Sequence, residues 1–207
     1  MISLFIDTSS SDVSIAIIKD NNILSSITKD IPSAHSIYTT RYINEVLEKA
    51  QIKPENINKI MVVNGPGSFT GVRIGVTIAK TMAYLLNKKV TVISSLKMLS
   101  LSLTHDYCLS VINANNNNYY IGLYDKNNNE VIKEQFTNIN TVNELIKKYN
   151  PTIISNENII INDINIQKQR LDFINIVNYY KEKEELNCHI VVPNYLKLPQ
   201  VLEKKND

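Results

Sequence analysis

The residues best suited to chemistry gather in a window of eleven residues that holds four of the chain's five glycines and one of its three arginines. The window reads Gly65-Pro66-Gly67-Ser68-Phe69-Thr70-Gly71-Val72-Arg73-Ile74-Gly75. Glycine is needed where φ is positive or where another backbone or a ligand comes close. An apolar run at 59–64 precedes the window and a stretch of helical period at 70–87 follows, so the predicted order is strand, turn, helix.

Such a turn presents backbone N–H groups at a helix N-terminus, where phosphate and other anions bind well. It is not a Walker A loop, because no Gly-Lys-Ser/Thr follows at the required spacing, and it is not a dinucleotide fingerprint, because Thr70 occupies the third glycine position counted from Gly65. Two interpretations stay open. The turn either binds a phosphate or is a tight strand-to-helix connection without a ligand.

The histidines and cysteines do not suggest a second centre. His35, His105 and His189 lie far apart in the sequence, with no second histidine one helical turn away, and metal sites need clustered ligands. Cys108 and Cys188 form no motif and indicate reduced residues with a packing role. No metal and no cofactor is expected.

Length and charge favour a cytoplasmic globular protein. The chain has 207 residues and a formal net charge of +2, without a basic stripe, so independent binding of nucleic acid is not indicated. We see no secretory signal and no apolar run long enough to span a bilayer, so no membrane contact is expected.

The helix predicted at 70–87 has small residues at every fourth position. They are Gly71, Gly75, Ala79 and Ala83, and they form one ridge. Most of the other faces are apolar, which predicts burial on nearly all sides. The helix is either a central core helix of one domain or packs on its sheet on one side and on a partner protein on the other.

The elements that position these residues alternate regularly. The first half predicts strands at 2–7, 13–18, 23–29, 59–64 and 90–94, and helices at 34–50, with Ser33 as N-cap, and 70–87. This βββαβαβ order describes one lobe of the actin/Hsp70/sugar-kinase (ASKHA) fold. The second half predicts strands at 108–114, 119–124, 131–136 and 152–155 and helices at 141–149 and 173–183. We therefore expect an α/β protein with two lobes and a reduced second lobe: 1–104 together with the C-terminal segment 190–207, and 105–189. The charged end at 203–207 is expected to fray.

Asp7 ends the first predicted strand, where sugar kinases of this fold hold an aspartate beside the nucleotide metal. The turn that follows, Thr8-Ser9-Ser10-Ser11-Asp12, has no glycine, so its side chains would crowd a phosphate. We interpret Asp7 as a structural remnant that caps the turn.

At this point the residues carry a specific resemblance. The eleven-residue window resembles the signature of the bacterial TsaB (YeaZ) family, and Ile6-Asp7-Thr8-Ser9, Ala34-His35-Ser36 and Pro193-Asn194-Tyr195-Leu196-Lys197 are similar to weaker family features. The resemblance runs along the N-terminal half and thins after about Tyr124. Two positions depart from the family pattern, which usually has Asp-Ala-Arg where Asn113-Ala114-Asn115 stands and Arg where Lys197 stands.

The resemblance implies a non-catalytic partner of a TsaD-type homologue. With a TsaE-type ATPase, such a complex transfers a threonylcarbamoyl group to the tRNA adenosine beside the anticodon, so this chain would meet the ATPase and tRNA only through the complex. The helices at 34–50 and 70–87 would contact the partner, or close a homodimer when the partner is absent. The predicted interface residues are Tyr38, Tyr42, Val46, Gly71, Gly75, Thr77, Ala79, Met82 and Ala83.

The alternative is an ATPase or small-molecule phosphotransferase of the same fold. It would need a glycine in the first turn and a Gly-rich adenosine loop in the second lobe, where only Gly122 occurs, so the scaffold role is favoured. In that role Gly65 and Gly67 serve backbone geometry, and Phe69 and Arg73 fix the helix N-terminus. The signature residues are Gly65, Gly67, Ser68, Phe69, Thr70, Gly71, Arg73 and Gly75.

Overall fold

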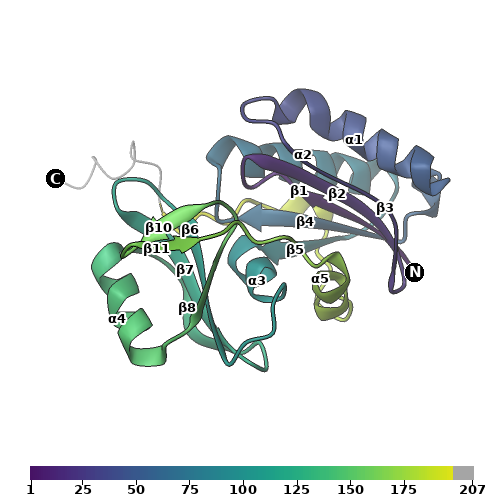
Figure 1. The fold of residues 1–207 in the computed structure, drawn as a ribbon. Coiled ribbons are helices and arrows are strands. Elements are labelled where there is room, and N and C mark those ends of the chain that lie inside the picture. Colours follow the sequence, from purple (N-terminus) through teal and green to yellow (C-terminus); the bar gives the residue numbers. More distant parts are fainter. Residues whose placement is uncertain (198–207) are drawn as a thin grey trace.

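The computed structural model describes residues 1–197 of the chain and shows two sheets side by side, each with its own helices (Figure 1). Residues 198–207 lie outside the described residues. They include the last part of the predicted C-terminal segment and the end that was expected to fray. Within the described residues, no helix has the length and apolar character needed to cross a membrane.

The first sheet has five strands in the order β3-β2-β1-β4-β5. The strands are β1 (Ile2–Asp7), β2 (Asp12–Lys19), β3 (Asn22–Asp30), β4 (Lys59–Gly65) and β5 (Val90–Ser94). β1, β2 and β3 pair in antiparallel fashion, whereas β4 is parallel to β1 and β5 is parallel to β4. Two helices, α1 (His35–Ala50) and α2 (Phe69–Leu85), cover one face (Figure 1). Side chains of these helices and of β1, β2 and β4 form one apolar core.

The other face of this sheet is covered by two short helices, α3 (Ser95–Ser100) and α5 (Phe173–Tyr179). The Phe173 ring meets the Phe5 ring edge-on, with 5.3 Å between the ring centroids. The helix α5 therefore packs on the first sheet although the sequence division placed it within 105–189. That division stays a prediction, and this packing favours assigning α5 to the first lobe.

The second sheet has four strands in the order β8-β7-β6-β9, and β9 runs parallel to β6. The strands are β6 (Tyr107–Asn113), β7 (Asn118–Asp125), β8 (Glu130–Asn138) and β9 (Thr152–Ser155). The amphipathic helix α4 (Ile139–Tyr149) buries Val142 and Leu145 against it. A small hairpin follows, formed by β10 (Ile159–Ile161) and β11 (Ile164–Ile166). Residues 1–197 also form two short 3₁₀ helices, η1 (Pro54–Asn56) and η2 (Cys188–Ile190).

The predicted two-lobe ASKHA architecture is confirmed, and most predicted elements start and end close to their observed bounds. Four details differ. Neither α3 nor the β10–β11 hairpin was predicted, and the last predicted helix ends at Tyr179 rather than at 183. Ser33 is not the N-cap of α1, because its φ of 63° turns the chain before the helix, and Ala34 occupies the cap position without a side-chain bond.

Candidate functional site

The glycine turn joins β4 to α2 and is packed on two other segments. A Cβ atom at Gly65, where φ is +113°, would lie 2.8 Å from the carbonyl oxygen of Asn194. A Cβ at Gly67 would overlap the carbonyl oxygen of Ser9. The backbone N–H of Asn194 donates to the carbonyl of Asn64 over 2.7 Å, so the C-terminal segment is tied to the end of β4. The glycines thus allow a close approach of three backbone segments.

Two N–H groups of this turn are engaged within the protein. The Ser68 N–H donates to the carbonyl of Ser9 over 2.7 Å, and Ser68 Oγ, as N-cap of α2, accepts from the Gly71 N–H over 3.2 Å. An anion that used the Ser68 and Gly71 N–H groups would have to replace these bonds. The geometry therefore favours the interpretation as a tight connection over that as a phosphate site.

Arg73 is held in a stack on the surface of α2. Its guanidinium carbon lies 3.7 Å from the centroid of the Phe69 ring, and its Nε donates to the Tyr195 hydroxyl over 2.7 Å. The Phe69 and Tyr195 rings lie 5.1 Å apart. Tyr195 was part of the family resemblance but was not proposed as a site residue, because nothing in the sequence shows that the C-terminal segment returns to α2.

The ridge of small residues faces the protein's own sheet and not a partner. Gly71, Gly75, Ala79 and Ala83 are buried, and a Cβ at Gly71 would overlap the carbonyl oxygen of Thr8. A Cβ at Gly75 would overlap the Thr8 hydroxyl and lie 3.7 Å from Val62. The small side chains let α2 lie directly on β1 and β4, which removes these residues from the predicted interface.

Only part of that predicted interface reaches the surface. Tyr42 and Val46 of α1 also belong to the core below the helices, whereas Thr77 is exposed and Tyr38 and Met82 are half-buried. An open groove runs between α1 and α2 on the outer side. Its lining residues are Ser36, Thr40, Phe69, Thr70, Arg73, Ile74, Thr77 and Ile78.

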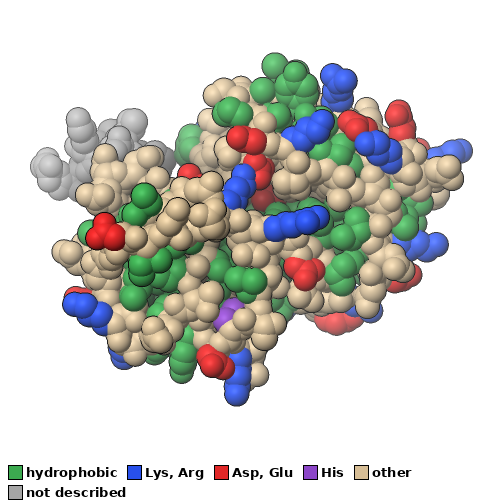
Figure 2. Space-filling view, in the orientation of Figure 1, with side chains coloured by type: hydrophobic (Ala, Val, Ile, Leu, Met, Phe, Trp, Pro, Cys, Tyr) green, Lys and Arg blue, Asp and Glu red, His purple; other side chains and the backbone are tan. Residues whose placement is uncertain are grey.

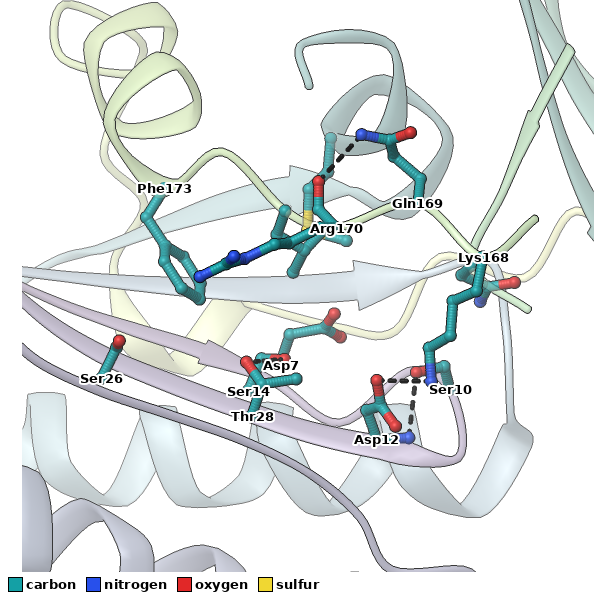
Figure 3. Close-up of a pocket in the computed structure, with 13 residues that line it drawn as sticks. Asp7, Ser10, Asp12, Ser14, Ser26, Thr28, Lys168, Gln169, Arg170 and Phe173 are labelled. Carbon is teal, nitrogen blue, oxygen red and sulfur yellow. Dashed lines mark hydrogen bonds and ion pairs between the residues drawn. The ribbon is translucent and has the colours of Figure 1, made fainter. Parts of the chain in front are cut away.

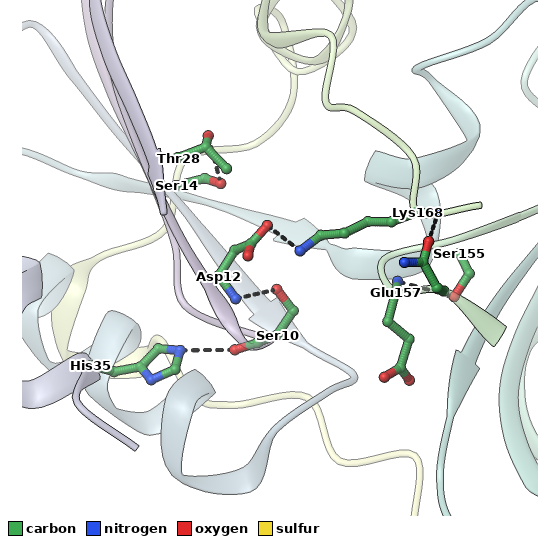
Figure 4. Close-up of polar contacts among 9 residues, drawn as sticks. Ser10, Asp12, Ser14, Thr28, His35, Ser155, Glu157 and Lys168 are labelled. Atoms are coloured by element: carbon green, nitrogen blue, oxygen red, sulfur yellow. Dashed lines mark hydrogen bonds and ion pairs between the residues drawn. The ribbon is translucent and has the colours of Figure 1, made fainter. Parts of the chain in front are cut away.

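A second candidate lies where the lobes meet, in a cavity of about 490 Å³ (Figure 3). Asp7 is only 4% exposed and its Oδ1 accepts from the Ser9 N–H over 2.8 Å, which confirms that it caps the turn. Burial is the main cause that raises the pKa of this carboxyl above its ordinary value. At the edge of the cavity, Asp12 Oδ2 pairs with Lys168 Nζ over 2.6 Å (Figure 4).

The hydroxyl groups that follow Asp7 are also engaged. Thr8 Oγ1 donates to the carbonyl of Gly71 over 2.7 Å, and Ser95 Oγ donates to Ser9 Oγ over 3.3 Å. His35 lies behind this turn, with Nε2 2.8 Å from the carbonyl oxygen of Ser10 (Figure 4). In the turn that would approach a phosphate in a kinase of this fold, the Thr8 and Ser9 side chains are therefore buried and bonded within the protein, whereas Ser10 lines the cavity. Within residues 1–197, no group of three His, Cys, Asp or Glu side chains is placed to hold a metal.

Comparison with known proteins gives the family. Residues 23–180 match the model of the family described as TsaD, tRNA N6-adenosine threonylcarbamoyltransferase. The tRNA threonylcarbamoyladenosine biosynthesis protein TsaB of Bacillus subtilis is 29% identical, over 99% of this chain and 97% of that protein. TsaB of Buchnera aphidicola from Schizaphis graminum is 30% identical, over 71% of this chain and 73% of that protein.

Solved structures agree with the observed fold. A Pseudomonas aeruginosa protein described as similar to the peptidase YeaZ aligns with a TM-score of 0.77 and 18% identity, over 95% of this chain and 99% of that one. A structure described as YeaZ from the same organism aligns with a TM-score of 0.75. The two sheets, their order of strands and the helices that cover them define a two-lobe protein of the ASKHA class. With the sequence matches, they show that the chain belongs to the TsaB (YeaZ) family. The relatives from Bacillus subtilis and Buchnera aphidicola are tRNA threonylcarbamoyladenosine biosynthesis proteins.

Proposed function

We propose that this chain acts in tRNA threonylcarbamoyladenosine biosynthesis as a non-catalytic subunit that binds and activates a TsaD-type transferase. The observation that carries the proposal is the outer groove between α1 and α2. One side of α2 is committed to the sheet through its small residues, while Ile74, Thr77 and the Phe69–Arg73 stack remain accessible on the other. An apolar groove with a polar rim is typical of a surface that a second protein covers.

The turn after β1 supports a role without phosphate chemistry. Phosphate binding in an ASKHA cleft needs a first turn that offers free donors, and here Thr8 and Ser9 are buried and bonded within the protein. The Asp7 carboxylate accepts the Ser9 N–H and so caps the turn. An ATPase or phosphotransferase stays the alternative, favoured only by the position of Asp7 in the cavity.

The proposal includes the order of assembly. The TsaD-type protein lies on the α1–α2 groove, and the TsaE-type ATPase and tRNA engage only the resulting complex. When the partner is absent, the same groove closes a homodimer. The location of the protein in the cytoplasm follows from the tRNA substrate of such a complex.

A titration with matched variants tests the groove. We expect Ile74→Lys to weaken binding of the TsaD-type protein by about tenfold or more, because it places a charge in the covered apolar part of the interface. The control is Ile164→Lys on the exposed part of the β10–β11 hairpin, which should bind as the unchanged chain does. The measurement is the dissociation constant by calorimetry, with circular dichroism to confirm folding. Normal affinity of a folded Ile74→Lys variant would rule out this interface.

A further inference from the structure

The cavity between the lobes is lined by charges of both signs, and residues 1–197 do not pair all of them. Figure 2 shows basic and acidic side chains gathered together where the two lobes meet. The lining residues are Asp7, Ser10, Asp12, Ser14, Ser26, Thr28, Met98, Asn156, Lys168, Gln169, Arg170, Leu171 and Phe173. Asp12 and Lys168 pair with each other, which leaves Asp7 and Arg170 as the two charged groups to be explained.

Asp7 is a buried carboxylate without a cation. Figure 3 shows its carboxylate pointing from the end of β1 into the cavity. Its Oδ1 accepts the Ser9 N–H, and within residues 1–197 Asp7 takes part in no ion pair. A buried carboxylate that lacks a cation costs free energy, and a bound ammonium group would recover part of that cost.

Arg170 lies across the cavity from Asp7, on the segment that crosses between the lobes (Figure 3). This segment is fixed in place: the Gln169 N–H donates to the carbonyl of Ser155 over 2.8 Å, and the Asp172 N–H donates to Ser102 Oγ over 3.3 Å. Within the described part of the chain, the Arg170 guanidinium pairs with no carboxylate. A guanidinium presented in this way is suited to a carboxylate, which it can bind through two parallel hydrogen bonds.

Size and lining limit the ligand. A volume of about 490 Å³ suits a small molecule. The hydroxyls of Ser14 and Thr28 are 3.1 Å apart on the strand side and offer polar contacts, and Met98, Leu171 and Phe173 supply an apolar wall. The carboxylate of Asp7, which is left after Asp12 pairs with Lys168, opposes a polyphosphate by repulsion. Opposite charges on opposite walls fit a dipolar molecule.

We propose that this cavity binds a small zwitterion, a free α-amino acid, with its ammonium group on Asp7 and its carboxylate on Arg170. The side chain of the amino acid would lie against Met98 and Phe173. The Asp12–Lys168 ion pair closes one edge of the site and joins β2 to the crossing segment. This site is separate from the α1–α2 groove, and the inference does not depend on the proposed function.

The test uses the full chain alone and the standard amino acids as probes, each at millimolar concentration, with ATP and magnesium chloride as probes of the other classes. We expect at least one amino acid to raise the melting temperature in a saturable way and to give a binding isotherm. Arg170→Ala and Asp7→Asn should each lower its affinity by about tenfold or more. The matched control is Arg41→Ala on the exposed surface of α1, which should bind as the unchanged chain does.

Three results would overturn the inference. They are the absence of a shift with every amino acid, a shift that Arg170→Ala leaves unchanged, and a shift produced by ATP or magnesium alone. Because Arg170 is exposed, Arg170→Ala is expected to fold normally. If Asp7→Asn proves unstable, the binding measured with Arg170→Ala still decides the test. Since no partner protein is present, failure here would leave the groove titration untouched.

Discussion

At the scale of single residues, Gly65 combines a positive φ with a close backbone contact in the signature turn. Its φ of +113° is strained for any residue with a side chain, and a Cβ atom would press on the carbonyl oxygen of Asn194. We expect Gly65→Ala to lower the free energy of unfolding by on the order of 1 kcal/mol or more. Urea unfolding measures this value directly.

The same variant distinguishes geometry from ligand binding. If the turn serves backbone geometry, tRNA modification should fall only in proportion to the complex that is lost. A Gly65→Ala chain that folds and binds its partner normally and yet supports no modification would instead indicate a phosphate site at the turn.

At the scale of elements, the small-residue ridge of α2 decides how closely the helix lies on its sheet. Gly75→Leu would drive a large side chain into Thr8 and Val62, and overpacking of a tight core costs about 1–3 kcal/mol or more. We expect the variant to melt far below the unchanged chain or not to fold. Thr77→Leu, an exposed position on the same helix, is the control and should melt normally. A stable Gly75→Leu chain that merely fails to bind the partner would place the ridge at the interface after all.

The elements also show how far the sequence could be read. The strands and the long helices were predictable, because runs such as 59–64 and the four-residue spacing of α2 have clear periods. The helix α3 and the β10–β11 hairpin are short, and the hairpin lies in an Asn-rich stretch, so no period stands out there.

The candidate sites were predictable only in part. The spacing of Gly71 and Gly75 indicated a ridge, but periodicity does not tell whether a ridge meets a sheet or a partner. Arg170 was not singled out, since only the folded chain brings it across the cavity from Asp7.

At the scale of the whole molecule, Lys97 joins the two lobes. Its ammonium donates to the carbonyl of Asn128 and lies 4.3 Å from the centroid of the Tyr124 ring and 4.8 Å from that of the Tyr179 ring. Burial lowers the pKa of Lys97 from 10.5 to about 8, although the carboxylates of Glu130, Glu134 and Asp125 act in the opposite direction.

This pKa shift predicts a pH dependence of stability. Between about 8 and 10.5 the folded chain binds fewer protons at Lys97 than the unfolded chain does, so the free energy of unfolding should rise with pH in that window. Lys97→Met lacks this contribution. Melting curves from pH 7 to 10.5 should show the unchanged chain gaining stability relative to Lys97→Met, and a constant difference between the two would contradict the assignment.

The central claim is that this chain works by binding a transferase and not by its own chemistry. The most direct test measures the threonylcarbamoyladenosine formed on tRNA in a reconstituted system with a TsaD-type and a TsaE-type protein. The measurement is the rate of modification against the amount of complex present, for the unchanged chain, Ile74→Lys and Ile164→Lys. We predict that the rate of modification is proportional to the amount of complex, with the same factor for all three chains. Ile74→Lys forms the least complex and should therefore give the lowest rate. The chain without its partner should give no modification. Full modification by Ile74→Lys without complex formation, or by the chain alone, would contradict it.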